Sequence, residues 1–98
     1  MLIKILIMGL IMGKVYNPFL DILPNIDVHG YNRDMMFYTL DVFIKGNIKL
    51  NNKKIVVIHG KGEGILKEEI HLILKKDKRV KRYYLDGFNN GCTVIELN

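Results

Sequence analysis

The sequence predicts an α/β domain with the element order β-α-β-α-β-β. Short β-branched or alternating runs that end at a glycine or a polar turn favour strands, and two longer segments carry apolar residues at helical spacing. Both prolines, Pro18 and Pro24, precede these segments, so no proline interrupts the remaining 74 residues. We therefore divide the chain into an apolar, proline-containing lead-in over 1–24 and a domain over 25–98.

The first half of the domain is predicted to hold a strand, a helix and a second strand. Residues 26–30 alternate and end at a glycine, which is typical of a short strand. Asn32 can cap the helix predicted over 33–49, whose apolar stripe recurs at i, i+4, i+7 and i+8 from Met36. Residues 54–58 form a β-branched run suited to a strand that is covered on both faces.

The second half is predicted to hold a helix and two more strands. A glycine-rich stretch leads into the helix over 65–76, and strands over 80–85 and 93–97 are joined by the loop 87–91. This order gives a mixed four-stranded sheet, with a parallel pair joined by a right-handed crossover and an antiparallel addition. Because two helices cannot cover both faces of four strands, we expect them mainly on one face and the other face open.

The net charge of +5 arises from one segment, which we call the basic stripe. Residues 75–82 hold six basic residues and one acidic residue, and the rest of the chain is formally neutral. Of the adjacent Tyr83 and Tyr84, one can pack and the other can stack on a base, so the stripe predicts contact with nucleic acid. The candidate contacts are Lys75, Lys76, Lys78, Arg79, Lys81, Arg82 and Tyr84. The alternative is that these lysines only complement the helix dipole and solvate a surface.

The cysteine count and the apolar start bear on location and assembly. Cys92 is the single cysteine, which excludes an intrachain disulfide and fits a reducing compartment, so we expect a cytoplasmic protein. The apolar run 5–13 is far shorter than the ~20 residues that cross a bilayer, so we expect no membrane span. Its repeated LIMG places Gly9 and Gly13 at a spacing that favours close helix approach, and a homodimer is one role for it. The alternatives are that this run is a strand or helix docked on the domain, or that the natural start is Met8 or Met12 and the given start lies upstream of it.

Two histidines occupy matching places at predicted strand ends. His29 and His59 each close a strand and precede a glycine, and Asp27 shares a face with His29. In neighbouring parallel strands both histidines emerge at the carboxyl edge, where open α/β sheets bind ligands. Asp27, His29 and His59 are therefore the candidate catalytic residues, and two unrelated histidines are the alternative. His71, between Lys67 and Lys75 on the second helix, is expected to face solvent.

The stretch before the second helix is a candidate phosphate cradle. Its glycines let the backbone approach an anion, the helix start adds partial positive charge, and a lysine adds a full charge. The candidate phosphate-binding residues are Gly60, Lys61, Gly62 and Gly64. The Walker A and GxGxxG patterns are absent, and short turns between a strand and a helix also use glycine for geometry alone.

The segments IDVHG, IHGKGEGILK and GCTVIEL together resemble the small MutS-related (Smr) domain. Residues 26–29 match its LDxH motif with isoleucine for leucine, residues 59–62 match HGxG, and residues 91–93 match its glycine-threonine entry to the last strand. The resemblance covers 25–98 in order and spacing. It implies a two-layer α/β sandwich similar to the C-terminal domain of translation initiation factor three. It also implies nucleic-acid binding and, in many members, endonuclease activity on DNA or on mRNA at stalled ribosomes.

Three functions are compatible with these residues. The leading hypothesis is an endonuclease acting on RNA or DNA, in which His29 and His59 act as acid and base and Asp27 orients a histidine or helps to hold a divalent ion. Asp27 and His29 alone are too few ligands to assign a metal, so a need for Mg²⁺ or Mn²⁺ is left open. The second hypothesis is a non-catalytic RNA- or ribosome-binding module with the same cradle and basic stripe. The third is a protein that binds a small phosphorylated molecule.

Overall fold

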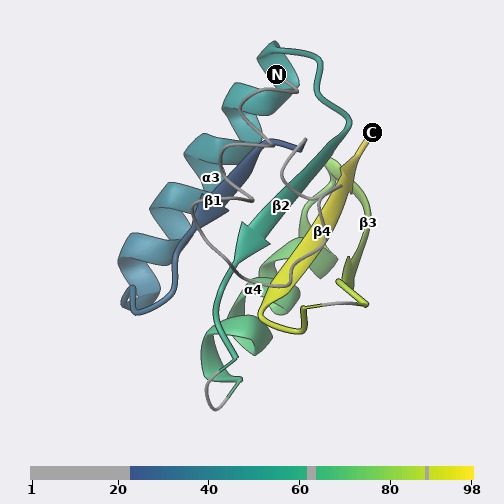
Figure 1. Ribbon diagram of the computed structural model, residues 1–98. Coiled ribbons are helices and arrows are strands. Elements are labelled where there is room, and N and C mark those ends of the chain that lie inside the picture. The colour runs from purple at the N-terminus through teal and green to yellow at the C-terminus, as the bar shows by residue number, and fades with distance from the viewer. Residues whose placement is uncertain (1–22, 62–63, 88) are drawn as a thin grey trace, which may run out of the picture.

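The computed structural model describes residues 23–61, 64–87 and 89–98. Its elements follow the predicted order and are β1 (Asn25–Asp27), α3 (Arg33–Lys49), β2 (Lys54–Ile58), α4 (Ile65–Lys76), β3 (Val80–Leu85) and β4 (Cys92–Leu97) (Figure 1). Residues 1–22 and Gly62 lie outside the described residues. The division into a lead-in over 1–24 and a domain over 25–98, and the homodimer segment, therefore stay predictions.

Helix α3 begins and ends where its sequence provides caps. The Asn32 side chain accepts a hydrogen bond of 2.8 Å from the backbone N–H of Met35, which satisfies a free donor of the first turn. At the other end Asn51 adopts a φ of 60°, a left-handed conformation that asparagine tolerates better than most residues. The chain then turns back into β2 along the sheet.

The four strands form one sheet in the order β1-β2-β4-β3. Strands β1 and β2 are parallel, as predicted, and β4 lies antiparallel to both β2 and β3. The last strand in the sequence is therefore central in the sheet, as Figure 1 shows between β2 and β3. Because β1 and β2 are parallel, their carboxyl ends and the start of α4 lie at the same edge.

Both described helices pack on one face of the sheet, in agreement with the predicted two-layer fold. Met36 of α3 and Ile70 of α4 share one apolar core with Ile55, Val57 and other inward residues of the sheet. The opposite face has a second buried cluster of Val56, Cys92 and Val94, against which Leu23 and Ile58 pack. As predicted, neither described helix packs on this second face. Val56, Cys92 and Val94 at its centre are nevertheless less than 5% exposed.

Candidate functional site

Asp27 and His29 form a hydrogen-bonded pair at the carboxyl edge of β1. The His29 Nδ1 atom lies 2.6 Å from Asp27 Oδ1, and the His29 backbone N–H donates to the same oxygen at 3.0 Å. A carboxylate that accepts from Nδ1 fixes the imidazole orientation and leaves Nε2 free. The His29 side chain is 70% exposed and that of Asp27 49%, so Nε2 is open to a substrate from solvent.

His59 is buried, unlike His29. It is only 5% exposed, its Nδ1 lies 3.0 Å from the carbonyl oxygen of Gly60, and its Nε2 lies 2.8 Å from the hydroxyl of Thr93. Burial is the main cause that lowers the His59 pKa, and nearby Lys67 lowers it further. Since both ring nitrogens already have protein partners, His59 is held as a neutral imidazole within the fold.

The two candidate histidines share an edge of the sheet but lie on opposite faces. Val28 belongs to the core on the helix side, so Asp27, its neighbour along the strand, points to the other face. His59 continues the alternation of Ile55 and Val57 and points to the helix side, where it meets Thr93. The parallel pairing of β1 with β2 thus places both histidines at the predicted edge of the sheet, but their side chains lie on opposite faces.

The candidate cradle is held by the last strand. The backbone N–H groups of His59 and Gly60 both donate to the carbonyl of Gly91, at 2.9 and 3.0 Å, so the Gly60 N–H is already used within the fold. Gly60 and Gly64 have φ values of 88° and 81°, which favour glycine. A Cβ on Gly91 would lie 3.2 Å from both the Gly60 carbonyl carbon and Lys61 Cγ, which explains the small residue there.

Among the described residues of the cradle, two groups remain available to an anion. Lys61 is exposed, and the first turn of α4 begins at Gly64 without a side-chain cap. Uncapped N–H groups at a helix start carry partial positive charge and bind anions. Lys61 and the start of α4, rather than the Gly60 N–H, are therefore the parts of the cradle that can meet a phosphate.

His71 is a site residue that sequence reasoning missed, because it was expected to face solvent. It is half-buried, and its Nε2 lies 2.8 Å from the same Thr93 hydroxyl that contacts His59. Its ring also meets the ring of Tyr83 edge-on at 4.9 Å. His71 follows Ile70 at the border of the apolar stripe of α4, and Thr93 is a hydroxyl residue within an apolar strand. These two features of the sequence could have indicated that His71 is a site residue.

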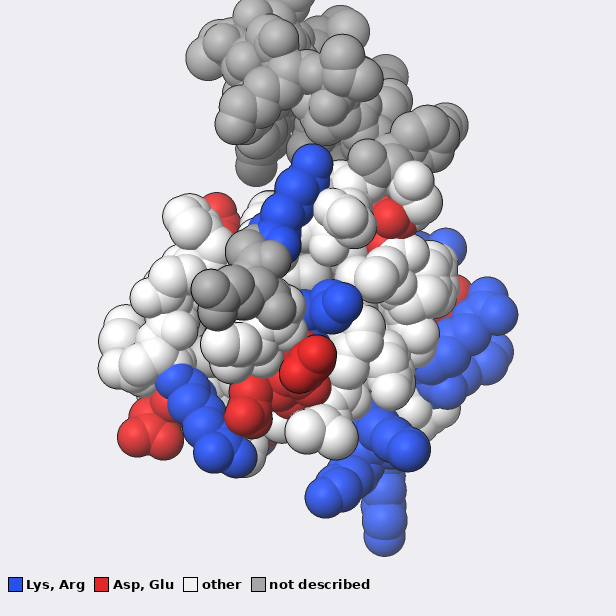
Figure 2. All heavy atoms as spheres, turned by 90° about the horizontal axis from the view of Figure 1, so that it is seen from below, with Lys and Arg blue, Asp and Glu red and all other residues white. Residues whose placement is uncertain are grey.

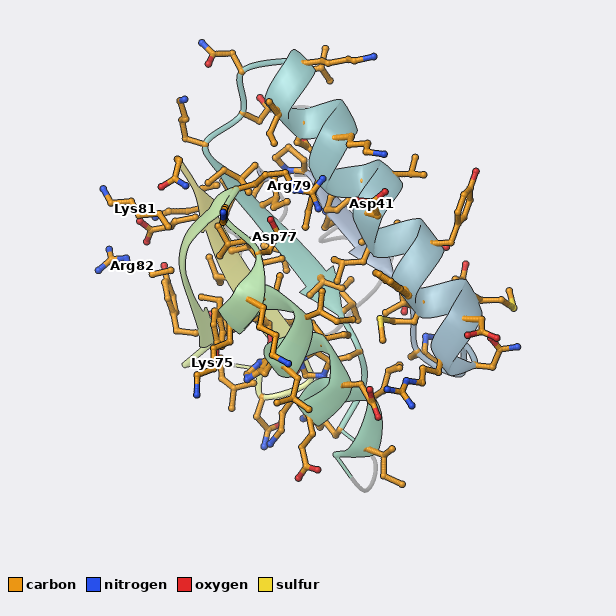
Figure 3. All side chains as sticks on the ribbon, turned by 180° about the vertical axis from the view of Figure 1, so that it is seen from behind. Asp41, Lys75, Asp77, Arg79, Lys81 and Arg82 are labelled. Atoms are coloured by element: carbon orange, nitrogen blue, oxygen red, sulfur yellow. The ribbon has the colours of Figure 1, made fainter. Side chains whose placement is uncertain are left out.

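The structure divides the basic stripe. Arg79 turns inward and contacts Asp77 at 2.6 Å and Asp41 of α3 at 2.9 Å, as the labelled side chains in Figure 3 show. The pKa of the Asp41 carboxyl is lowered by Lys45 first and then by Arg79, and Arg79 lowers the pKa of Asp77. The two carboxylates in turn raise the pKa of the Arg79 guanidinium. Arg79 therefore ties the start of β3 to α3, and most of its charge is neutralised locally.

The remaining basic residues of the stripe point to different sides. Tyr83 packs on the helix side of the sheet, whereas Arg82 reaches Glu96 on the other face, at 2.8 Å from Nε to Oε2. The Arg82 guanidinium also lies over Tyr84, 5.8 Å from the ring centre. In Figure 3 Lys81 and Arg82 project together, away from Lys75. Figure 2, which views the edge with the strand ends, likewise shows basic groups separated by uncharged and acidic ones.

The part of the chain that the structure describes has neither a cluster of metal-ligating side chains nor a helix suited to span a membrane. Among residues 23–61, 64–87 and 89–98, no three His, Cys, Asp or Glu side chains gather closely enough to hold a metal ion. Over the same residues, none of the helices combines the length and apolarity needed to cross a bilayer.

The chain resembles known proteins over most of its length. The family model of the Smr domain matches residues 26–98. The chain is 41% identical over 71 residues to the endonuclease MutS2 of Finegoldia magna, and 36% identical over 76 residues to that of Clostridium acetobutylicum. These alignments cover 72% and 74% of this chain but only 9% and 10% of those proteins.

Two solved structures have the same fold. The Smr domain of Thermus thermophilus MutS2 superposes with a TM-score of 0.75 at 25% identity, covering 78% of this chain and 99% of that domain. YdaL, a stand-alone small MutS-related protein from Escherichia coli, gives a TM-score of 0.70 at 17% identity, covering 76% of this chain and 63% of that protein. The second likeness concerns the fold alone.

Proposed function

This chain belongs to the Smr domain family, and we propose that it is an endonuclease that cleaves phosphodiester bonds of RNA or DNA. The observation that carries the proposal is the Asp27–His29 pair, which presents a free and exposed Nε2 atom at the edge where the cradle lies. The family supports a role in nucleic-acid binding. Its curated relatives are named as endonucleases, and this chain spans about a tenth of their length.

In the proposed reaction His29 is the catalytic residue that moves the proton. Its Nε2 atom takes the proton of the attacking group, which is a water molecule or a ribose 2′-hydroxyl, as the new P–O bond forms. The bond to the leaving oxygen breaks, and that oxygen takes a proton from water. Asp27 holds Nδ1 and stabilises the imidazolium that results. Lys61 and the N–H groups at the start of α4 offset the charge on the phosphate.

His59 has a different proposed role from the one predicted by its place in the sequence. Its buried ring and its two protein partners suit a positioning residue that fixes the Gly60 carbonyl and the turn into α4. Neither of its ring nitrogens is free to take a proton from an attacking hydroxyl, since each already has a protein partner. We therefore assign the acid–base work to His29 alone among the three histidines.

The other predicted contacts remain part of the proposal. Lys75, Lys76, Lys78 and Lys81 hold phosphates of the bound strand, and Tyr84 on the opposite sheet face offers a ring for a base. Action in the cytoplasm, association with the ribosome and a homodimer formed through residues 5–13 are further predictions. Ribosome sedimentation profiles and light scattering of the intact chain test them.

The alternative is a non-catalytic RNA- or ribosome-binding module. It is favoured by the single exposed imidazole at the site and by the lack of a three-ligand metal cluster among the described residues. Incubation of the purified chain with structured RNA, single-stranded RNA and supercoiled DNA, with and without Mg²⁺ or Mn²⁺, separates the two. Cleavage lost in His29→Ala supports the nuclease, and binding with all three substrates left intact supports the module.

A further inference from the structure

The buried histidine, the threonine and the half-buried histidine form one directional chain of hydrogen bonds. The Gly60 carbonyl can only accept, so the His59 Nδ1 atom 3.0 Å away carries the proton. In the neutral ring Nε2 then has no hydrogen and must accept, and the Thr93 hydroxyl at 2.8 Å is its donor.

The same reasoning fixes the state of His71. Thr93 has a single hydroxyl hydrogen, which it gives to His59, so its oxygen accepts from His71 Nε2 at 2.8 Å. Burial is the main cause that lowers the His71 pKa, and His59 and Lys67 lower it further, so the neutral ring is favoured. Neutral His71 with its hydrogen on Nε2 has a lone pair on Nδ1. No hydrogen bond in the described residues occupies that atom.

His71 lines a shallow groove between α4 and β3. The groove has a volume of about 330 Å³ and is lined by Lys67, Glu68, His71, Leu72, Lys75 and Tyr83. Lys67, His71 and Lys75 lie four residues apart, so they form one row along the helix at intervals of ~6 Å. The row therefore presents a cation, a hydrogen-bond acceptor and a second cation, with the Tyr83 ring beside His71.

We propose that this groove is a ribose subsite, in which His71 Nδ1 accepts a hydrogen bond from a 2′-hydroxyl and Lys67 and Lys75 hold the flanking phosphates. A phosphate oxygen cannot satisfy the Nδ1 lone pair, because both are acceptors. The 2′-hydroxyl is a donor that RNA has and DNA lacks. The inference rests on the proposed nucleic-acid function and adds that RNA is the preferred strand. Glu68 lines the same groove and disfavours a phosphate close to it.

The test compares RNA with the DNA strand of identical sequence, with deoxyuridine for uridine, so that the two differ only in the 2′-hydroxyl. Binding is measured by fluorescence anisotropy in the His29→Ala background, which prevents cleavage from disturbing the equilibrium. RNA is expected to bind up to about tenfold more tightly, which is the upper end of the net contribution of one hydrogen bond. His71→Phe, which keeps a ring beside Tyr83, is expected to remove this preference. The preference should also decline as pH falls through the His71 pKa measured by NMR, because the protonated ring no longer accepts.

Matched variants separate the subsite from general electrostatics. Lys67→Gln and Lys75→Gln should weaken the binding of RNA and DNA equally. Lys49→Gln, an exposed lysine in the last turn of α3, should leave the affinity for both strands unchanged. A second experiment leaves the groove unchanged and replaces the riboses of the RNA one at a time by deoxyribose. At one position this replacement should weaken binding by up to about tenfold. The inference is overturned if RNA and DNA bind equally well, or if a folded His71→Phe protein keeps the preference for RNA. It is also overturned if no single deoxyribose replacement weakens binding. RNA preference through His71 without any cleavage would leave the subsite standing and reject the nuclease.

Discussion

The hydroxyl of Thr93 lies 2.8 Å from Nε2 of His59, a residue 34 positions earlier in the chain. Both side chains are buried, so this contact ties the end of β2 to the central strand β4 beneath the candidate site. Because His71 meets the same hydroxyl, one oxygen atom links three segments of the fold.

Thr93→Val is expected to lower the free energy of unfolding by roughly 1–3 kcal/mol. Valine has nearly the same shape but leaves the buried His59 Nε2 without its donor. Urea unfolding measures the effect, with Thr39→Val, a half-buried position on α3, as the control. Equal losses at both positions would show that the hydrogen bond contributes nothing particular.

Stability is expected to fall as the solution becomes acidic below about pH 6.5. The folded chain holds His59 and His71 with pKa values below the ordinary 6.5, mainly through burial, so the unfolded chain binds protons first. The contribution of the two histidines to the free energy of unfolding is therefore largest above pH 6.5, decreases below it, and levels off once pH is under their folded pKa values. Urea midpoints across this range test the slope, and NMR titration of the imidazole protons gives the pKa values directly. A flat profile to about pH 5 would contradict the prediction.

His29→Ala is expected to lower the cleavage rate by about 10²–10⁴-fold while binding is retained, because it removes the proposed base. Asp27→Asn should reduce the rate less, since it weakens the orientation of an imidazole that is still present. Single-turnover cleavage and anisotropy on the same RNA separate rate from affinity. Asp34→Asn, in the first turn of α3, is the matched carboxylate control. Loss of binding in step with cleavage would argue against a catalytic role.

Arg79→Gln and Lys78→Gln are expected to act on different properties. Arg79 is held by two carboxylates, so its replacement should lower the free energy of unfolding by about 1 kcal/mol and change RNA affinity little. Lys78 is exposed, so its replacement should leave stability unchanged and reduce the salt dependence of RNA binding by about one ion. Thermal unfolding and anisotropy at several salt concentrations measure both. If Arg79→Gln instead weakened RNA binding and left stability unchanged, Arg79 would belong to the surface that binds nucleic acid.

Much of the fold could be predicted because its signals are local. The cap at Asn32, the apolar stripe from Met36 and the β-branched run Lys54–Ile58 each depend on neighbours within a few residues. Asp27 and His29 also belong to this class, because an aspartate at the end of a strand can accept hydrogen bonds from the residue two positions on. The pair at 2.6 Å therefore follows from the sequence once the strand is recognised.

The rest depended on segments far apart in the chain. Sequence order could not reveal that β4 inserts between β2 and β3, and this insertion brings Thr93 to His59 and His71. It also could not show that Arg79 turns toward Asp41 of α3, because the partner lies on another element.

The sequence by itself determined the order of elements, the carboxyl edge and the residues placed there, because hydrophobic period and turn chemistry act over short distances. Only the tertiary structure decided on which face of the sheet the side chains of His29 and His59 lie. That choice follows from the pleat, which alternates side chains between faces, and from the strand order, which gives buried His59 a threonine partner and leaves His29 in solvent.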